Sequence, residues 1–168
     1  SEALGLTLQE LDDWNCCGAT EYFTVNRLPA YSLVARNLAI AAKQDTSEVV
    51  ATCSACYFNL RRVDDNINKY PNLGEKVNQA LAAGGLHYEP GNLHIRHLLD
   101  VIVQDVGYDA VRSKVSKKLS GLRVAPYYGC LVVRPYQEEN VGTDYPTHMD
   151  DLMTTLGATI VDFPMKAR

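Results

Sequence analysis

The stretch SEVVATCSACYFNLRRVDDNIN, residues 47–68, decides the fold predicted for this chain. Ser47–Thr52 is short, apolar and partly β-branched, which is typical of a buried strand. The C-x-x-C pair of Cys53 and Cys56 follows at once, and apolar residues then recur at helical spacing over Tyr57–Asn68. The stretch therefore predicts a strand, a cysteine-bearing turn and a helix, which is the order of an α/β unit.

A similar order precedes this stretch. Leu6–Leu11 alternates apolar and polar residues, which predicts a strand that leads into a loop with Cys16 and Cys17. Tyr31–Lys43 has the periodicity of a helix. Two consecutive units of this kind favour parallel strands, so we expect both cysteine pairs at the same end of adjacent strands, where α/β folds build their sites.

The rest of the chain is predicted to be helical first and mixed afterwards. Helices are expected over Leu73–Ala83, Asn92–Gly107, Tyr108–Gly121 and Asp144–Gly157, and strands within Leu122–Pro135 and Ala158–Phe163. Leu4–Leu11 can be laid over Leu156–Phe163 with apolar residues matching at most places, which indicates an internal repeat. On this interpretation the chain is the middle of a longer protein, and neither repeat is complete.

Charge and hydropathy exclude some functions. The net charge of −4 and the pI near 5.5 give no overall attraction to nucleic acid or to an anionic membrane. No apolar run is long enough to span a bilayer, and the N-terminus lacks the pattern of a signal peptide. We therefore expect a cytoplasmic protein without a transmembrane segment.

The cysteines carry the functional prediction. They are odd in number and mostly paired, which points to metal or redox chemistry more than to a disulfide framework: Cys16, Cys17, Cys53, Cys56 and Cys130. A disulfide between adjacent cysteines would be strained, and zinc ligands are usually two to four residues apart. Adjacent thiols fit better where sulfurs bind different irons of one large cluster, although zinc and a plain dithiol stay open. Gly18, without a side chain, would let the backbone approach such a cluster.

CCG followed by CSAC resembles the cysteine-rich CCG domain found in the B-type subunit of heterodisulfide reductase and in its relatives. The pattern in that family is one cysteine, then CCG, then CxxC, usually present twice. The resemblance extends to DWNCCGA (13–19), ARNLA (35–39), Tyr57 after the C-x-x-C, and YYGC (127–130).

The resemblance implies a noncubane 4Fe-4S cluster in each complete module. Cys16, Cys17, Cys53 and Cys56 match the last four ligands of a first module, and Cys130 matches the first ligand of a second. The implied domains are the end of one module over residues 1–70, a helical connector over 71–121 and the start of a second module over 122–168. Trp14 and Tyr57, which flank the cysteines, are expected to shield the site from water.

The implied activity is that of an oxidoreductase component that reduces a disulfide between two thiol coenzymes, as in CoM-S-S-CoB. The implied partners are the other components of a heterodisulfide reductase, namely its C-type iron–sulfur electron donor and its A-type flavin protein. The fragment alone is expected to be inactive. Two alternatives remain: an electron-transfer subunit of a succinate or hydroxy-acid dehydrogenase, and an assembly module that holds zinc or no metal.

Overall fold

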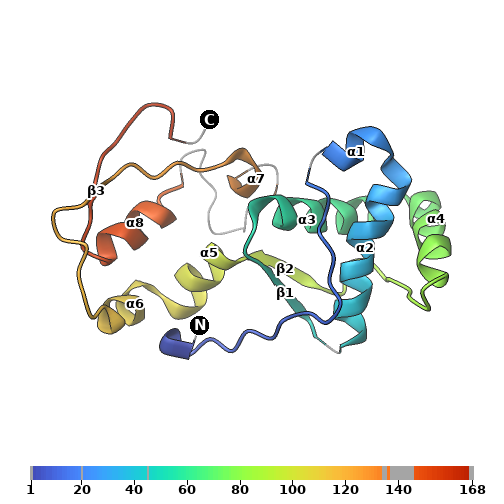
Figure 1. Cartoon of the computed structure of the whole chain (residues 1–168), viewed down its shortest axis with the longest axis horizontal. Coiled ribbons are helices and arrows are strands. Elements are labelled where there is room, and N and C mark those ends of the chain that lie inside the picture. Colours follow the sequence, from blue (N-terminus) through green and yellow to red (C-terminus); the bar gives the residue numbers. More distant parts are fainter. Residues whose placement is uncertain (1, 20, 45, 134–135, 137–145, 167–168) are drawn as a thin grey trace. The chain divides into compact units, whose positions relative to one another are not determined.

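The computed structural model describes residues 2–19, 21–44, 46–133, 136 and 146–166. Two compact units divide the chain. The cysteine-pair unit is Glu10–Arg96, and the terminal unit combines Ser1–Gln9 with His97–Arg168. Helices and short strands occur in both, so the α/β class predicted from the sequence is confirmed (Figure 1).

The cysteine-pair unit packs helices around a small sheet. Its elements are α1 (Glu21–Val25), α2 (Arg27–Lys43), β1 (Glu48–Ala51), α3 (Ser54–Lys69), α4 (Pro71–Ala82) and β2 (His94–His97). Strands β1 and β2 form a two-stranded sheet, next to which the His94 N–H donates to the Ser47 carbonyl at 2.8 Å. Helix α2 packs against both α3 and α4.

The core of this unit comes from the helix faces that the sequence predicted. Its buried side chains include Val34, Leu38 and Ala41 of α2, Tyr57, Val63 and Ile67 of α3, and Val77 and Leu81 of α4. Pro71 is the first residue of α4, a position where its missing N–H costs nothing. The helices predicted over Tyr31–Lys43, Tyr57–Asn68 and Leu73–Ala83, and the strand over Ser47–Thr52, are thereby confirmed.

Two predictions for the segments around this core are wrong. The strand predicted over Leu6–Leu11 is absent from the described structure, because this segment pairs with none of the described strands. The helix expected over Asn92–Gly107 is instead β2, then α5 (Leu98–Val101) and a π-helical turn, η2 (Ile102–Val106). Here the pairing with β1 overrides a helical pattern, and His94 and His97 lie on a strand.

The terminal unit has shorter elements. They are η1 (Glu2–Leu4), α5, η2, α6 (Tyr108–Lys114), β3 (Arg123–Val124), α7 (Cys130–Val133), α8 (His148–Thr155) and β4 (Thr159–Ile160). Strands β3 and β4 are parallel, with Arg123 opposite Thr159 and Val124 opposite Ile160. Tyr128, Val133 and Met149 form an apolar cluster in this unit.

Each long element predicted for the terminal unit is shorter in the structure. The helix expected over Tyr108–Gly121 ends at Lys114, and the strand expected over Ala158–Phe163 is reduced to β4. Within Leu122–Pro135 a two-residue strand is followed by the helical turn α7, and residues 134–135 lie outside the described residues. The helix expected over Asp144–Gly157 is α8, and residues 144–145 also lie outside the described residues.

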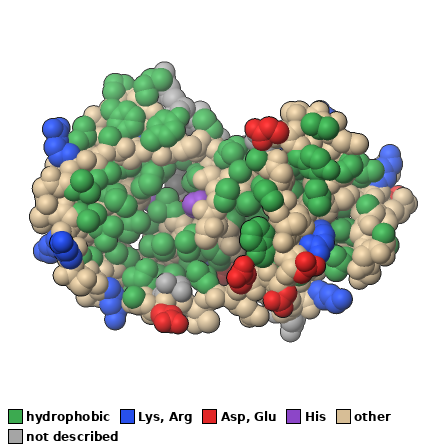
Figure 2. All heavy atoms as spheres, viewed as in Figure 1, with side chains coloured by type: hydrophobic (Ala, Val, Ile, Leu, Met, Phe, Trp, Pro, Cys, Tyr) green, Lys and Arg blue, Asp and Glu red, His purple; other side chains and the backbone are tan. Residues whose placement is uncertain are grey.

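Apolar side chains also occur on the surface. Figure 2 shows hydrophobic side chains over much of the face in view. Trp14, Val25, Leu122 and Tyr127 are among the large exposed ones. Within the described parts of the chain, no helix has the length and apolar character needed to cross a membrane.

Candidate metal centre

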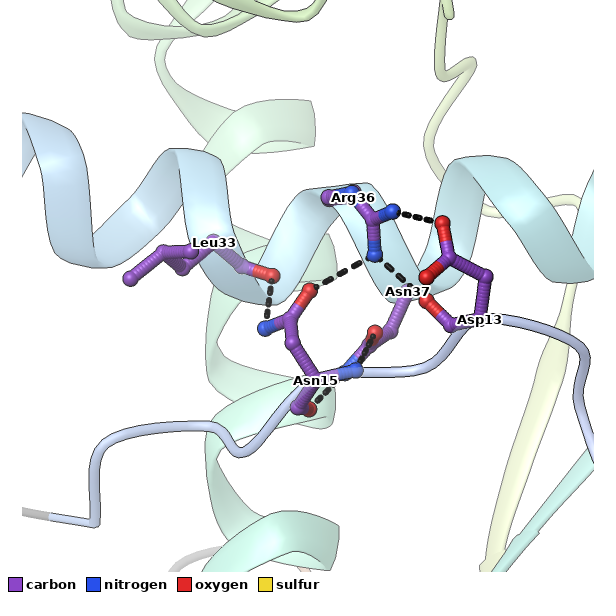
Figure 3. A network of polar contacts seen from close by, with 5 residues as sticks. All are labelled: Asp13, Asn15, Leu33, Arg36 and Asn37. Atoms are coloured by element: carbon purple, nitrogen blue, oxygen red, sulfur yellow. Dashed lines mark hydrogen bonds and ion pairs between the residues drawn. The ribbon is translucent and has the colours of Figure 1, made fainter. Parts of the chain in front are cut away.

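The loop that carries the adjacent cysteines is fastened to α2 by Asn15 (Figure 3). The Asn15 backbone N–H donates to Asn37 Oδ1 at 3.0 Å, and Asn37 Nδ2 donates to the Asn15 carbonyl at 2.7 Å. The Asn15 side chain adds a bond from Nδ2 to the Leu33 carbonyl at 3.0 Å. The backbone directly before Cys16 is therefore fixed on a helix.

Arg36, also in α2, binds the same loop two residues earlier, at Asp13. Its Nη1 donates to the Asp13 carbonyl at 2.6 Å and to Asn15 Oδ1 at 3.1 Å, and its Nη2 pairs with the Asp13 carboxylate. Figure 3 shows these side chains meeting between the loop and α2. Two motifs behind the family resemblance, DWNCCGA and ARNLA, are thus bonded to each other.

A tight turn follows the cysteines. Gly18 and Ala19 both have positive φ angles, 72° and 50°. A Cβ atom on Gly18 would lie 2.8 Å from the Cβ of Tyr22, closer than real Cβ contacts come. Gly18 is therefore required by the turn and by Tyr22; its predicted place beside a cofactor stays a prediction.

The turn directs the two cysteines differently. Cys17 is buried, whereas Cys16 is exposed and its sulfur accepts the Gly18 N–H at 3.4 Å. The Cys17 Sγ lies 3.5 Å from the Cys56 Sγ. Two sulfurs bound tetrahedrally to one metal ion at about 2.3 Å would lie about 3.8 Å apart, so this pair is already near ligand spacing.

The C-x-x-C pair stands at the beginning of α3. Cys53 is the N-cap residue of the helix, next to the first backbone N–H groups, which have no partner within the helix. The N–H of Cys56 is the main cause that lowers the pKa of the Cys53 thiol below its ordinary value, and partial burial opposes it. Burial and the neighbouring Cys17 sulfur raise the pKa of Cys56 to about 12. The helix N–H groups thus favour the thiolate of Cys53, whereas burial beside Cys17 favours the neutral thiol of Cys56.

Asn59 is the site residue that the sequence interpretation missed. It lies in α3 and is fully buried, and its Nδ2 is 3.4 Å from the Cys17 Sγ and 2.7 Å from the Ala19 carbonyl oxygen. Its position three residues after Cys56, on the same side of a helix, was the signal that could have found it.

The two aromatic residues predicted to shield the cysteines, Trp14 and Tyr57, differ in their exposure to solvent. Tyr57 is buried, whereas Trp14 is 56% exposed and its indole N–H donates to Glu10 at 2.9 Å. Trp14 therefore stands largely in solvent, and shielding of the site by the buried Tyr57 stays a prediction.

Cys130 belongs to the terminal unit, where it is exposed at the beginning of α7. Nearby in sequence, the Tyr128 hydroxyl donates to Asp150 Oδ2 at 2.9 Å and accepts the Met149 N–H at 2.6 Å. Asp150 is also paired with Lys166 Nζ at 2.5 Å. This buried polar group fixes the segment that leads to Cys130.

The donor set fits a thiophilic metal such as iron. The structure brings the Cys17 and Cys56 sulfurs together and places Cys53 one helical turn before Cys56. No group of three or more cysteine, histidine or acidic side chains within the described residues is close enough to hold a metal ion. Sulfur-only pairs are nevertheless the ligands of iron–sulfur clusters and of soft metal ions.

The fold and these thiols define an α/β protein with a cysteine site at the beginning of a helix. Residues 1–61 match the CCG family of cysteine-rich domains. The resemblance to this family that the sequence predicted is confirmed, and the similar proteins include ones named as the B-type subunit of heterodisulfide reductase or as like it.

The similar proteins are components of reductases by name. The chain is 36% identical over 163 residues to the 8-methylmenaquinol:fumarate reductase membrane anchor subunit of Wolinella succinogenes, covering 95% of this chain and 55% of that protein. It is 29% identical over 165 residues to a protein of Archaeoglobus profundus named as like the B-type subunit of heterodisulfide reductase, with 93% and 53% covered. It is 26% identical over 159 residues to the B-type subunit of the ferredoxin/F(420)H(2)-dependent CoB-CoM heterodisulfide reductase of Methanosarcina acetivorans, with 94% and 52% covered. The chain spans about half the length of these curated relatives.

Proposed function

We propose that this chain is part of an iron–sulfur electron-transfer subunit of a reductase complex. Cys16, Cys17, Cys53 and Cys56 would hold one noncubane 4Fe-4S cluster, and Cys130 would contribute to a second. When bound, such a cluster takes up and releases electrons one at a time.

One observation carries this proposal. The Cys17 and Cys56 sulfurs lie 3.5 Å apart, near the spacing of two ligands of one metal ion. The Cys16 sulfur accepts the Gly18 N–H, and the N–H of Cys56 lowers the pKa of the Cys53 thiol. N–H donors stabilise thiolate, which is the form in which cysteine binds a metal.

The surrounding residues have supporting tasks. Asn15 and Asn37 fix the loop, and Tyr57, which is buried directly after Cys56 in the chain, would exclude water from one side. Cys16 and Cys53 are exposed, so the site is open to a substrate or to a partner protein on their side. With electrons delivered through the metal centre, the reaction needs no dominant protein acid or base.

The proposed reaction is reduction of a disulfide between two thiol coenzymes, with electrons from a C-type iron–sulfur protein and an A-type flavin protein of a heterodisulfide reductase complex. It is supported by relatives that are named as the B-type subunit of CoB-CoM heterodisulfide reductase or as similar to it. Exposure of two of the four thiols of the site is compatible with access for a substrate sulfur.

A second candidate is supported by a different relative. The protein of Wolinella succinogenes is named as a subunit of a fumarate reductase that uses 8-methylmenaquinol. In this case the same cysteines would pass electrons within a complex that reduces fumarate. Reduced viologen as electron donor, with heterodisulfide or fumarate as acceptor, separates the two reactions when the purified complex is assayed.

The metal itself is tested first. Full-length protein purified without oxygen is expected to be brown and to contain several irons per module. The Cys17→Ser variant is expected to lose this colour, because one ligand sulfur is removed. A colourless protein with one zinc would overturn the iron–sulfur proposal in favour of an assembly module, and unchanged iron in C17S would exclude Cys17 as a ligand.

A further inference from the structure

We infer that Asn59 is a positioning residue for the metal centre: its amide N–H group holds the Cys17 sulfur and the turn after it in the position needed for metal binding. The role toward the metal rests on the proposed function. The contacts themselves are made by the chain alone, so part of the inference can be tested without metal.

One amide group joins a helix to the cysteine loop. Asn59 Nδ2 donates to the Ala19 carbonyl at 2.7 Å and to the Cys17 Sγ at 3.4 Å. Asn59 lies one helical turn after Cys56, whose sulfur contacts the same Cys17 sulfur at 3.5 Å. Cys17 is therefore held from α3 by a sulfur contact and by an N–H donor.

The orientation of the amide follows from its partner. The Ala19 carbonyl oxygen can only accept a hydrogen bond, so the amide atom at 2.7 Å from it must be the NH₂ group. The Cys17 sulfur consequently also faces a donor. A sulfur that accepts an N–H bond is presented as a ligand thiolate would be, and such bonds raise the reduction potential of a cluster by stabilising its more negative state.

The other end of the amide argues against a packing role. Asn59 is 0% exposed, and its Oδ1 has no hydrogen-bond partner among the residues that the structure describes. A buried acceptor without a partner opposes folding, and leucine fills a buried position without that cost. The donor end, not the packing of α3, accounts for an asparagine at this position.

The turn gives the donor a second task. Ala19 has a φ of 50°, in the left-handed region that residues other than glycine rarely adopt. Its carbonyl is the group that Asn59 binds, so this bond stabilises a strained residue two positions after Cys17. Loss of the bond should release the turn and expose the buried sulfur.

The test compares Asn59→Leu with Asn66→Leu. Asn66 is on the same helix, and its Nδ2 donates to the Tyr31 hydroxyl at 2.7 Å, so the control also loses a side-chain hydrogen bond, but one made away from the cysteines. In metal-free protein, native-state alkylation of Cys17, followed by mass spectrometry, is expected to become about tenfold faster in N59L, as for the loss of one hydrogen bond. N66L is expected to keep the wild-type rate.

A second measurement addresses the metal. In iron-loaded full-length protein, the midpoint potential of N59L is expected to be more negative than that of the wild type, while N66L is unchanged. Circular dichroism confirms that each variant is folded. If N59L does not fold, Asn59→Ser replaces it, because serine keeps a small donor and should give an intermediate alkylation rate.

The outcomes separate the inference from the proposed function. Equal Cys17 alkylation in N59L and N66L would overturn the role of Asn59 in holding the turn. Iron-loaded protein with an unchanged potential in N59L would overturn its role toward the metal. Wild-type protein that binds no iron would instead overturn the proposed function, and the alkylation rates would still decide whether Asn59 positions Cys17.

Discussion

Asn15 and Asn37 show how a single pair of residues places the adjacent cysteines. The backbone N–H and carbonyl of Asn15 are both hydrogen-bonded to the Asn37 side chain. These two bonds fix the loop as pairing with a neighbouring strand would. The Arg36–Asp13 ion pair beside it is more exposed, with an Asp13 side chain that is 84% accessible. We therefore attribute the position of the loop mainly to the asparagines, because exposed ion pairs contribute little.

Asn37→Ala is expected to lower the free energy of unfolding by about 2 kcal/mol, since two part-buried hydrogen bonds are lost. Asp13→Ala is expected to cost less than about 1 kcal/mol. Urea unfolding measures both, and Asn68→Ala, at an exposed position of α3, serves as the control. Equal losses in N37A and D13A would contradict this ranking.

Gly18→Ala is expected to destabilise the protein by about 1 to 2 kcal/mol, because a left-handed φ of 72° disfavours a Cβ atom. The new atom would also meet Tyr22 at 2.8 Å. The double variant G18A/Y22A removes this contact and leaves the backbone strain. Thermal unfolding of the wild type, G18A, Y22A and the double variant therefore divides the cost between the two causes, and a G18A protein as stable as the wild type would exclude both.

At the scale of elements, the sequence was informative where local periodicity and tertiary contacts agree. Helices α2, α3 and α4 each carry a continuous apolar face, and that face is buried against the other two. The segment around Ile95 has apolar residues at helical spacing too, but it forms β2 because a strand partner, β1, is available. Pairing between distant segments cannot be read from a local pattern.

The candidate site follows the same rule. The cysteines could be found because their residue type alone is informative, and the C-x-x-C at the beginning of α3 is where the sequence placed it. The spacing of Asn59 from Cys56 was a weak signal, since asparagine is common on helix surfaces and only the fold brings Asn59 to Cys17. Asn37 was within a motif that carried the resemblance, but its bonds to Asn15 depend on how α2 meets the loop.

His97 gives a pH-dependent prediction for the beginning of α5. Its Nδ1 accepts the Leu99 N–H at 3.2 Å, and burial lowers its pKa below the ordinary value. The folded chain therefore binds the proton more weakly than the unfolded chain. The stabilisation is complete above the unfolded pKa of about 6.5 and is lost as pH falls from there toward the folded pKa.

The His97→Asn variant tests this, because asparagine can cap a helix but does not titrate in this range. Urea unfolding between pH 7.5 and 5.5 is expected to show a loss of stability in the wild type and a smaller loss in H97N. Carboxyl groups contribute equally to both proteins, so the difference belongs to His97. Parallel curves would show that His97 is not the group responsible.

At the scale of the whole molecule, the two units carry different parts of the proposed function. The cysteine-pair unit contains four of the five cysteines, and the terminal unit contains Cys130. The division into modules at residues 70 and 121 concerns a repeat and stays a prediction, since compactness alone defines these units. We therefore expect the metal-dependent protection of the four paired cysteines to be independent of Cys130.

Removal of iron from the full-length protein, by oxidation in the presence of EDTA, is expected to lower the thermal transition. The reason is that metal binding contributes to the free energy of folding, and each kcal/mol lost lowers the transition by about 2 to 4 °C for a folding unit of about 150 to 250 residues. Alkylation of Cys16, Cys17, Cys53 and Cys56 should increase at the same time.

The control is the Cys130→Ser variant. Its iron-loaded form should still protect these four thiols from alkylation, because Cys130 lies in the other unit. If the four thiols react equally fast with and without iron, they are not the ligands, and if C130S abolishes their protection, the two sites are not independent.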